Sequence, residues 1–190
     1  APDSADYRLF VAGAPRNSAA PPHLDAFKWC PTPITPRWWA RIWHRAHIPL
    51  PVETFVGRVD VYHATDFVLP PTLPHTKTIL TVHDLSFVRV PESASPKLKR
   101  YLDRVVPSSV RRANLVLADS QATRDDLIAL YHTNPAKIHV LLSGVDARFA
   151  PATSDEQTLP RKYNIPLRPY IFSVGTVKKK KNYARLMQAV

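Results

Sequence analysis

Short apolar segments alternate with helical patterns along most of the chain. The clearest are Thr78–Val82, Leu115–Ala118 and Ile138–Leu142, each followed at once by polar residues. Strands that are buried on both faces of a parallel sheet have this kind of pattern. Two earlier segments, Tyr7–Ala12 and Val59–Tyr62, are similar. Because these strands alternate with helices, the pattern predicts an α/β fold with a doubly wound parallel sheet.

Capping residues and prolines predict where the helices begin and end. A Thr-Pro pair opens a helix over residues 35–45, and a glycine ends a short helix at 51–57. The longest helix begins at Ser95, with an apolar face and an opposite basic face. A proline inside it predicts a kink or break near Val106. Ser120 is expected to cap the next helix.

Proline-rich and polar segments divide the chain. Residues 13–34 are rich in proline, and we expect them to be irregular. Residues 1–151 are predicted to form one Rossmann-like domain that lacks its first strand, and residues 152–168 a linker. A further strand, Tyr170–Val174, followed by a loop and a helix, predicts the truncated start of a second Rossmann-like domain over 169–190. We therefore expect the chain to be a piece of a longer polypeptide.

Composition narrows the range of partners. The formal net charge of +11 favours anionic partners, namely phosphorylated substrates, an acidic membrane surface or nucleic acid. With 4 glycines, the chain contains neither a G-x-G-x-x-G nor a Walker motif. A lone cysteine cannot form an internal disulfide, and neither a spanning segment nor a signal-peptide pattern is present. We therefore expect a cytoplasmic protein, with peripheral binding to the inner face of the membrane as one option.

Titratable residues follow the predicted strands at the edge where α/β sheets bind ligands. His63 and His83 each end a strand, and Asp66 and Asp84 lie in the loops behind them. A histidine in this position can donate to a sugar hydroxyl or a phosphate, or take part in proton transfer. It can also be structural and satisfy loop carbonyls. A metal site needs three or four ligands, and nothing in this spacing is diagnostic of one, so we expect no metal.

A basic loop follows the last predicted strand. Gly175 and Thr176 lead into Lys178–Lys181, directly before a predicted helix. Ammonium groups together with free backbone N–H groups at a helix start form a natural diphosphate site. A run of charges is also typical of a solvated loop. We favour diphosphate binding for Lys180 and Lys181, and solvation for the first two lysines.

The predicted helix over 35–45 combines tryptophans with arginines. Its side chains of these two kinds are Arg37, Trp38, Trp39, Arg41, Trp43 and Arg45. They can dock the helix on the domain through the aromatic rings and leave the arginines in solvent. They also suit a membrane interface or stacking on single-stranded nucleic acid. We favour docking, with the membrane as the second interpretation and nucleic acid as the weakest.

Five segments in order resemble those of family 4 glycosyltransferases. These segments are Val59–His63, Thr81–Leu85, Ala118–Leu127, Gly144–Asp146 with Phe149 and Pro151, and Tyr170–Thr176 with Lys181 and Asn182. The resemblance covers roughly residues 55–190 and is weak before them. It implies the GT-B fold, in which two Rossmann-like domains face each other across the active-site cleft. It also implies retaining, hexosyltransferase-like transfer from a nucleotide-sugar to the hydroxyl of a polysaccharide or lipid-linked acceptor, without a metal or other cofactor.

The resemblance also implies roles for individual residues. His83 matches the histidine that contacts the transferred sugar, and it is our catalytic candidate. Lys181 matches the lysine that neutralises the donor diphosphate. His63, Asp66 and Asp84 are expected in the acceptor and sugar cleft.

The chain also departs from the family pattern. Thr176 follows Gly175 where many members have an arginine, so the diphosphate would depend more on Lys181 and its neighbours. The glycine-rich loop of the family's N-terminus and the carboxylate pair of its C-terminal domain are absent from these residues, so we expect the chain alone to be inactive. The rival hypothesis is a non-catalytic basic module that binds an anionic membrane or nucleic acid.

Overall fold

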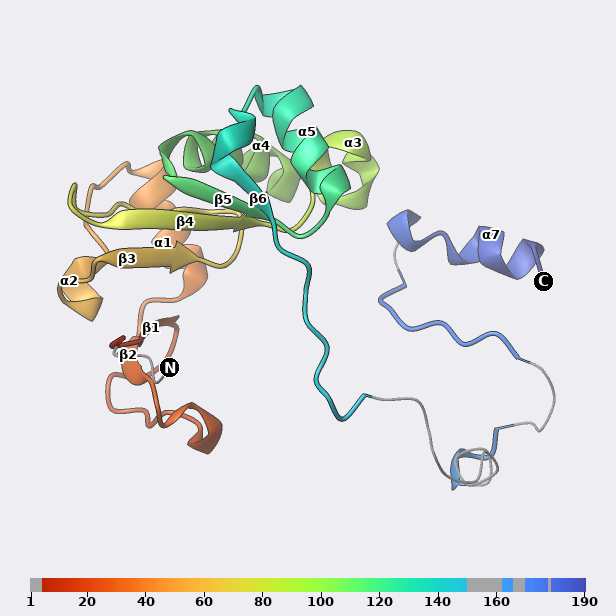
Figure 1. Cartoon of the computed structure of the whole chain (residues 1–190), viewed down its shortest axis with the longest axis horizontal. Helices are drawn as coiled ribbons and strands as arrows, with labels where there is room; N and C mark the ends of the chain where they lie inside the picture. The colour runs from red at the N-terminus through yellow and green to blue at the C-terminus, as the bar shows by residue number, and fades with distance from the viewer. Residues whose placement is uncertain (1–4, 150–161, 166–169, 178) are drawn as a thin grey trace.

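All strand pairs in the computed structural model are parallel. The structure describes residues 5–149, 162–165, 170–177 and 179–190. One sheet has four strands in the spatial order β3 (Val61–Ala64), β4 (Lys77–Val82), β5 (Leu115–Ala118) and β6 (Ile138–Val140). The second sheet pairs β1 (Arg8–Ala12) with β2 (Lys28–Thr32). The predicted α/β fold with parallel sheets is confirmed (Figure 1).

The main core lies between the four-stranded sheet and the helices above it in Figure 1. Leu80 of β4 and Val116 of β5 are fully buried. Val106 of α4 (Pro96–Arg112) and Leu127 of α5 (Gln121–Tyr131) are buried in the same cluster. Burying one such side chain stabilises the fold by about 1.5–3 kcal/mol. The apolar runs that predicted β4 and β5 therefore form the centre of the domain.

The helix boundaries agree with the capping residues. Ser95 Oγ accepts from the Leu98 backbone N–H at 3.4 Å, and Ser120 Oγ accepts from that of Thr123 at 3.1 Å, so each serine caps its helix. α4 nevertheless continues unbroken through its internal proline, so no helix end lies near Val106. The buried side chains of α4 hold it against the sheet, and this packing outweighs the missing proline N–H.

Short elements connect the strands and the longer helices. Their bounds are η1 (Pro22–Leu24), α1 (Pro36–Ala40), the π-helical η2 (Arg41–Arg45), α2 (Glu53–Val56), α3 (Ser86–Arg89), η3 (Pro91–Ser93) and η4 (Pro135–Lys137). The predicted helices at 35–45 and 51–57 are thus present. Gly57 ends α2 with a φ of 76°, a conformation that favours glycine.

The proline-rich segment is only partly irregular, contrary to the prediction. It contains β2, whose Pro31 lies opposite Val11 of β1. Proline cannot donate a ladder hydrogen bond, but a strand at the edge of a sheet tolerates it. In this two-stranded sheet β2 pairs with β1 alone. Pro31 is therefore the reason why the sequence pattern did not predict this edge strand.

The predicted strand Tyr170–Val174 is not formed. Residues 170–177 have no regular secondary structure, and Ile171 and Phe172 are 63% and 78% exposed. A strand needs a neighbour to pair its backbone groups, and within the described ranges no strand pairs with this segment. The helical pattern behind it is present as η5 (Lys179–Lys181) and α7 (Tyr183–Gln188). The boundaries of the second domain stay a prediction, and most of the proposed linker lies outside the described residues.

Candidate functional site

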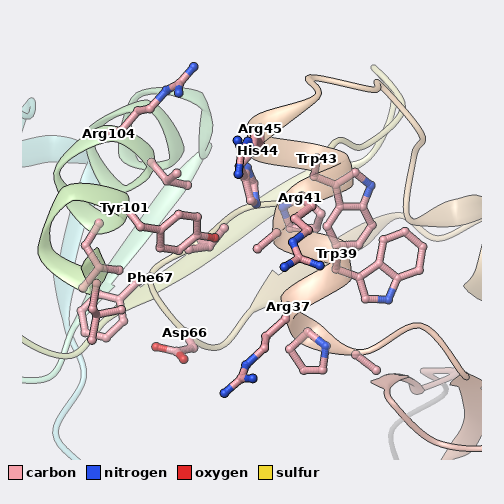
Figure 2. A pocket seen from close by; sticks show the side chains of 18 of the residues that line it. Arg37, Trp39, Arg41, Trp43, His44, Arg45, Asp66, Phe67, Tyr101 and Arg104 are labelled. Carbon is pink, nitrogen blue, oxygen red and sulfur yellow. The ribbon is translucent and has the colours of Figure 1, made fainter. Parts of the chain in front are cut away.

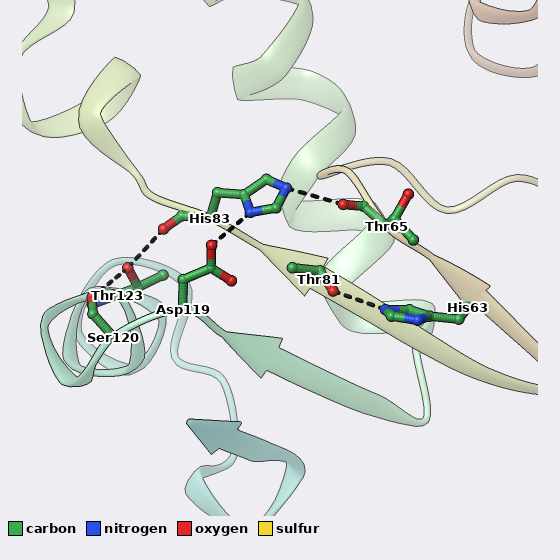
Figure 3. Close-up of polar contacts among 7 residues, drawn as sticks. All are labelled: His63, Thr65, Thr81, His83, Asp119, Ser120 and Thr123. Carbon is green, nitrogen blue, oxygen red and sulfur yellow. Dashed lines mark hydrogen bonds and ion pairs between the residues drawn. The ribbon is translucent and has the colours of Figure 1, made fainter. Parts of the chain in front are cut away.

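His83 lies directly after β4, at the carboxyl edge of the sheet, and both of its ring nitrogens have partners. Nδ1 is 2.7 Å from Asp119 Oδ2, and Nε2 is 3.0 Å from the carbonyl oxygen of Thr65 (Figure 3). Both partners are acceptors, so the arrangement suits an imidazolium that donates twice. The hydrogen bond to Asp119 is the largest of the effects that raise the pKa of His83 above 6.5.

The register of the sheet explains why His83 meets Asp119. Val82 of β4 pairs with Ala118 of β5, so the next residue of each strand emerges at the same level. A second hydrogen bond links His83 to the start of α5, where Thr123 Oγ1 donates to the carbonyl oxygen of His83 at 3.0 Å. Asp119 was not among the predicted site residues. Its proximity to the Ser120 cap was visible in the sequence, but the pairing of β4 with β5 was needed to see its contact with His83.

His63 belongs to a separate hydrogen-bonded pair. It lies within β3, and its Nε2 is 2.8 Å from Thr81 Oγ1 (Figure 3). Burial lowers the pKa of His63 below 6.5, so this ring favours the neutral form. Thr81 belongs to β4 and stands two residues before His83 in the sequence. The structure thus places His63 in β3 and His83 directly after the neighbouring β4. The pKa of His63 is lowered, whereas that of His83 is raised.

The two predicted aspartates lie in different surroundings. Asp84 Oδ1 accepts from the Ser86 backbone N–H at 2.8 Å, where α3 begins. Asp66 is exposed and lines the large groove described next. Of the two, Asp66 is therefore the better placed to meet a ligand, and Asp84 shapes the loop after His83.

A groove of about 1150 Å³ lies between α1 with η2, the loop after β3, and the first turns of α4 (Figure 2). Its side chains are largely basic and aromatic. The charged ones are Arg37, Arg41, Arg45, Asp66, Lys97, Arg100 and Arg104. Burial is the main cause that lowers the pKa of His44, in the same wall, to about 4, so this histidine is neutral near pH 7. The arginines and the lysine therefore set the charge of the groove.

The aromatic residues of α1 and η2 dock this helical segment on the domain. Trp39 is 3% exposed, and its ring stacks on Trp43 with centroids 4.2 Å apart. Phe10 of β1 and Phe55 of α2 contact Trp39 edge-on. Trp38 is 56% exposed. Two of the three tryptophans thus serve the docking that the sequence favoured.

The predicted diphosphate residues lie far from the histidines in sequence. Gly175, Thr176 and Lys181 are exposed, and Lys180 lies beside Lys181 in η5. η5 lies against η3, in the segment that follows His83. Within the described ranges no hydrogen bond or ion pair joins Lys181 to His83. In the same part of the chain, no group of three or more His, Cys, Asp or Glu could hold a metal ion. No described helix is long and apolar enough to cross a membrane.

Comparison with known proteins identifies the family. The model of Glycosyltransferase Family 4 matches residues 4–149, so the chain belongs to glycosyltransferase family 4. The match begins well before residue 55, so the N-terminal strands belong to the family domain although the predicted resemblance was weak there. O-antigen chain mannosyltransferase B of Escherichia coli is 28% identical over 131 residues, which are 68% of this chain and 34% of that protein. The chain thus spans about a third of the length of that relative.

Proposed function

We propose that this chain supplies the acceptor-side half of a retaining glycosyltransferase, which transfers a sugar from a nucleotide-sugar to an acceptor hydroxyl. The observation that carries the proposal is the position of His83 at the carboxyl edge of β4, fixed by Asp119, in a chain of this family. Ligands of α/β folds bind at this edge. A preorganised donor there can act on a substrate without first rearranging.

His83 acts in this proposal as a hydrogen-bond donor to the transferred sugar. Nδ1–H is engaged by Asp119, so Nε2–H, which donates to the Thr65 carbonyl, is the group proposed to be shared with a sugar oxygen. A protonated ring donates more strongly than a neutral one. Asp119 is a positioning residue because it fixes the ring and favours its protonated form. His63, Asp66 and Asp84 are proposed to shape the cleft for the acceptor and the sugar.

The donor diphosphate is proposed to bind the basic loop near the end of the chain. Gly175, Thr176, Lys180 and Lys181 are the residues assigned to it. Negative charge builds on the departing diphosphate during glycosyl transfer, so nearby ammonium groups would lower the barrier. The position of η5 beside the segment after His83 supports this assignment.

A transfer assay tests the proposed function. The polypeptide encoded by the gene is incubated with labelled nucleotide-sugars and lipid-linked or polysaccharide acceptors. Nucleotide-linked mannose comes first, because the similar Escherichia coli protein is a mannosyltransferase. Transfer with the anomeric configuration of the donor retained, read by proton NMR of the product, supports the proposal. An inverted product contradicts the retaining mechanism, and binding of oligonucleotides with no transfer from any donor favours the rival basic module.

A further inference from the structure

The cations of the groove have no carboxylate partners among the described residues. The ion pairs of that part of the chain involve other side chains, such as Lys99 with Asp103 and Arg89 with Asp126. The groove lining contains six basic side chains and a single acidic one, Asp66. Unpaired cations gathered in one concave site raise the local concentration of anions. The groove is therefore built for a negatively charged ligand.

Neighbouring side chains contact two of these cations. The guanidinium of Arg41 lies 4.5 Å from the ring centroid of Trp38, and the helix that carries both is docked by Trp39. On the opposite wall, Arg104 Nη2 is 3.4 Å from His47 Nε2. Ser95 and Lys97 bring the N-terminal turn of the 17-residue helix α4 to the groove, with its positive dipole end. Guanidinium groups suit planar, bidentate binding of phosphate oxygens.

The groove adjoins the candidate catalytic histidine. Asp66 and Phe67 line it, and they follow Thr65, whose carbonyl oxygen accepts from His83. The ring of Phe67 also contacts the ring of His83 edge-on, with centroids 5.5 Å apart. A ligand whose anionic group lies among the arginines could thus present another part of itself beside His83.

We propose that this groove binds the phosphate or diphosphate group of the acceptor, so that the enzyme selects a phosphorylated acceptor. This inference rests on the proposed function, because it assigns the acceptor class of the same site. Arg37 and Arg41, on the wall formed by α1 and η2, are proposed to bind the phosphate oxygens (Figure 2).

The binding test uses inorganic pyrophosphate and NMR of the whole chain. We expect pyrophosphate to shift the Nε–H signals of Arg37 and Arg41 and the indole signal of Trp38. Trp29 serves as an internal control, because its indole donates to Ser18 Oγ outside the groove. The double variant Arg37→Gln with Arg41→Gln should weaken this binding about 100-fold, since each lost charge-assisted hydrogen bond costs roughly tenfold.

A matched control and a competition complete the test. The double variant Arg58→Gln with Arg111→Gln removes two exposed arginines outside the groove lining and should leave the pyrophosphate affinity unchanged. Competition by a soluble sugar phosphate, or by phosphatidylcholine vesicles that contain a polyprenyl diphosphate, supports the proposal and tells which source the enzyme uses. Unmoved groove signals, an unaffected groove variant, or competition by neither ligand overturns it.

The two proposals can fail separately. If the groove signals do not move but the transfer assay still gives product, the acceptor class is wrong and the glycosyltransferase function stands. If pyrophosphate binds in the groove but no nucleotide-sugar supports transfer, the phosphate site is present and the proposed glycosyltransferase function is wrong.

Discussion

His83 Nδ1 and Asp119 Oδ2 lie 2.7 Å apart and join the carboxyl ends of β4 and β5. This contact fixes the imidazole at the carboxyl edge of the sheet, where α/β folds bind ligands. It also favours the protonated ring, since a neighbouring carboxylate stabilises positive charge. Nε2, toward the Thr65 carbonyl, is left as the position through which a substrate can be contacted.

The first prediction concerns the charge of His83. Asp119→Asn removes the main cause of its raised pKa, so an NMR titration of the ring should give a lower pKa than in the wild type. A raised pKa contributes stability that is fully present below the unfolded value of 6.5 and is lost as pH rises through the folded value. The variant should therefore lose most stability below pH 6.5 and least at high pH. An unchanged titration would show that Asp119 does not set the charge of His83.

The second prediction concerns the docking of α1 and η2. Trp39→Ala should lower the free energy of unfolding by about 3–5 kcal/mol, because it removes a buried aromatic side chain. Trp38→Ala is the matched control, since that ring is 56% exposed, and it should cost well under 1 kcal/mol. Urea denaturation of both variants gives the comparison. Equal losses would mean that the aromatic cluster does not hold this helix.

The third prediction concerns the proline inside α4. Pro107→Ala restores a backbone N–H that can donate to the Asp103 carbonyl, so we expect a gain of about 1–3 kcal/mol in stability. Pro96→Ala makes the same exchange at the first helical position, where no N–H partner is needed, and should change stability little. Thermal unfolding measures both. A loss in the Pro107 variant would show that the proline ring itself packs in a necessary way.

The fourth prediction concerns the start of α5. Ser120→Ala removes the side chain that accepts from Thr123 N–H and should cost about 1 kcal/mol. Gln121→Ala, one residue later and exposed, is the control and should be nearly neutral. Because Thr123 Oγ1 also donates to the His83 carbonyl, the cap variant should broaden the NMR signals of His83. Sharp, unshifted His83 signals would show that the Ser120 cap does not influence the position of His83.

The sequence alone was sufficient to predict the central strands and the helices that follow them. The apolar runs at β4 and β5 and the serine caps before α4 and α5 depend on local patterns, and each is present. β2 was missed because Pro31 is a local signal against a strand, whereas pairing with β1 is a long-range contact. The strand predicted at 170–174 is not formed for the converse reason. Its local pattern suits a strand, but among the described residues no neighbouring strand pairs with it.

The site shows the same division between local and long-range information. His83 could be selected from its place after an apolar run, and its role beside the transferred sugar stays a prediction. Its contact with Asp119 depends on the register between strands that are separated by α4. The basic groove was not predicted either, because its walls come from α1, η2, the loop after β3 and α4. The basic face of α4 and the arginines of α1 and η2 were each visible, but only the fold brings them together.

The most direct measurement is turnover of the His83→Gln variant in the polypeptide that the gene encodes. Glutamine keeps a side-chain N–H but cannot carry the positive charge, so we expect transfer to fall about 100-fold or more. Arg89→Gln, which breaks an exposed ion pair with Asp126, is the control for folding and should keep full activity. Transfer by the His83 variant at the wild-type rate, with folding intact, would contradict the central role of His83.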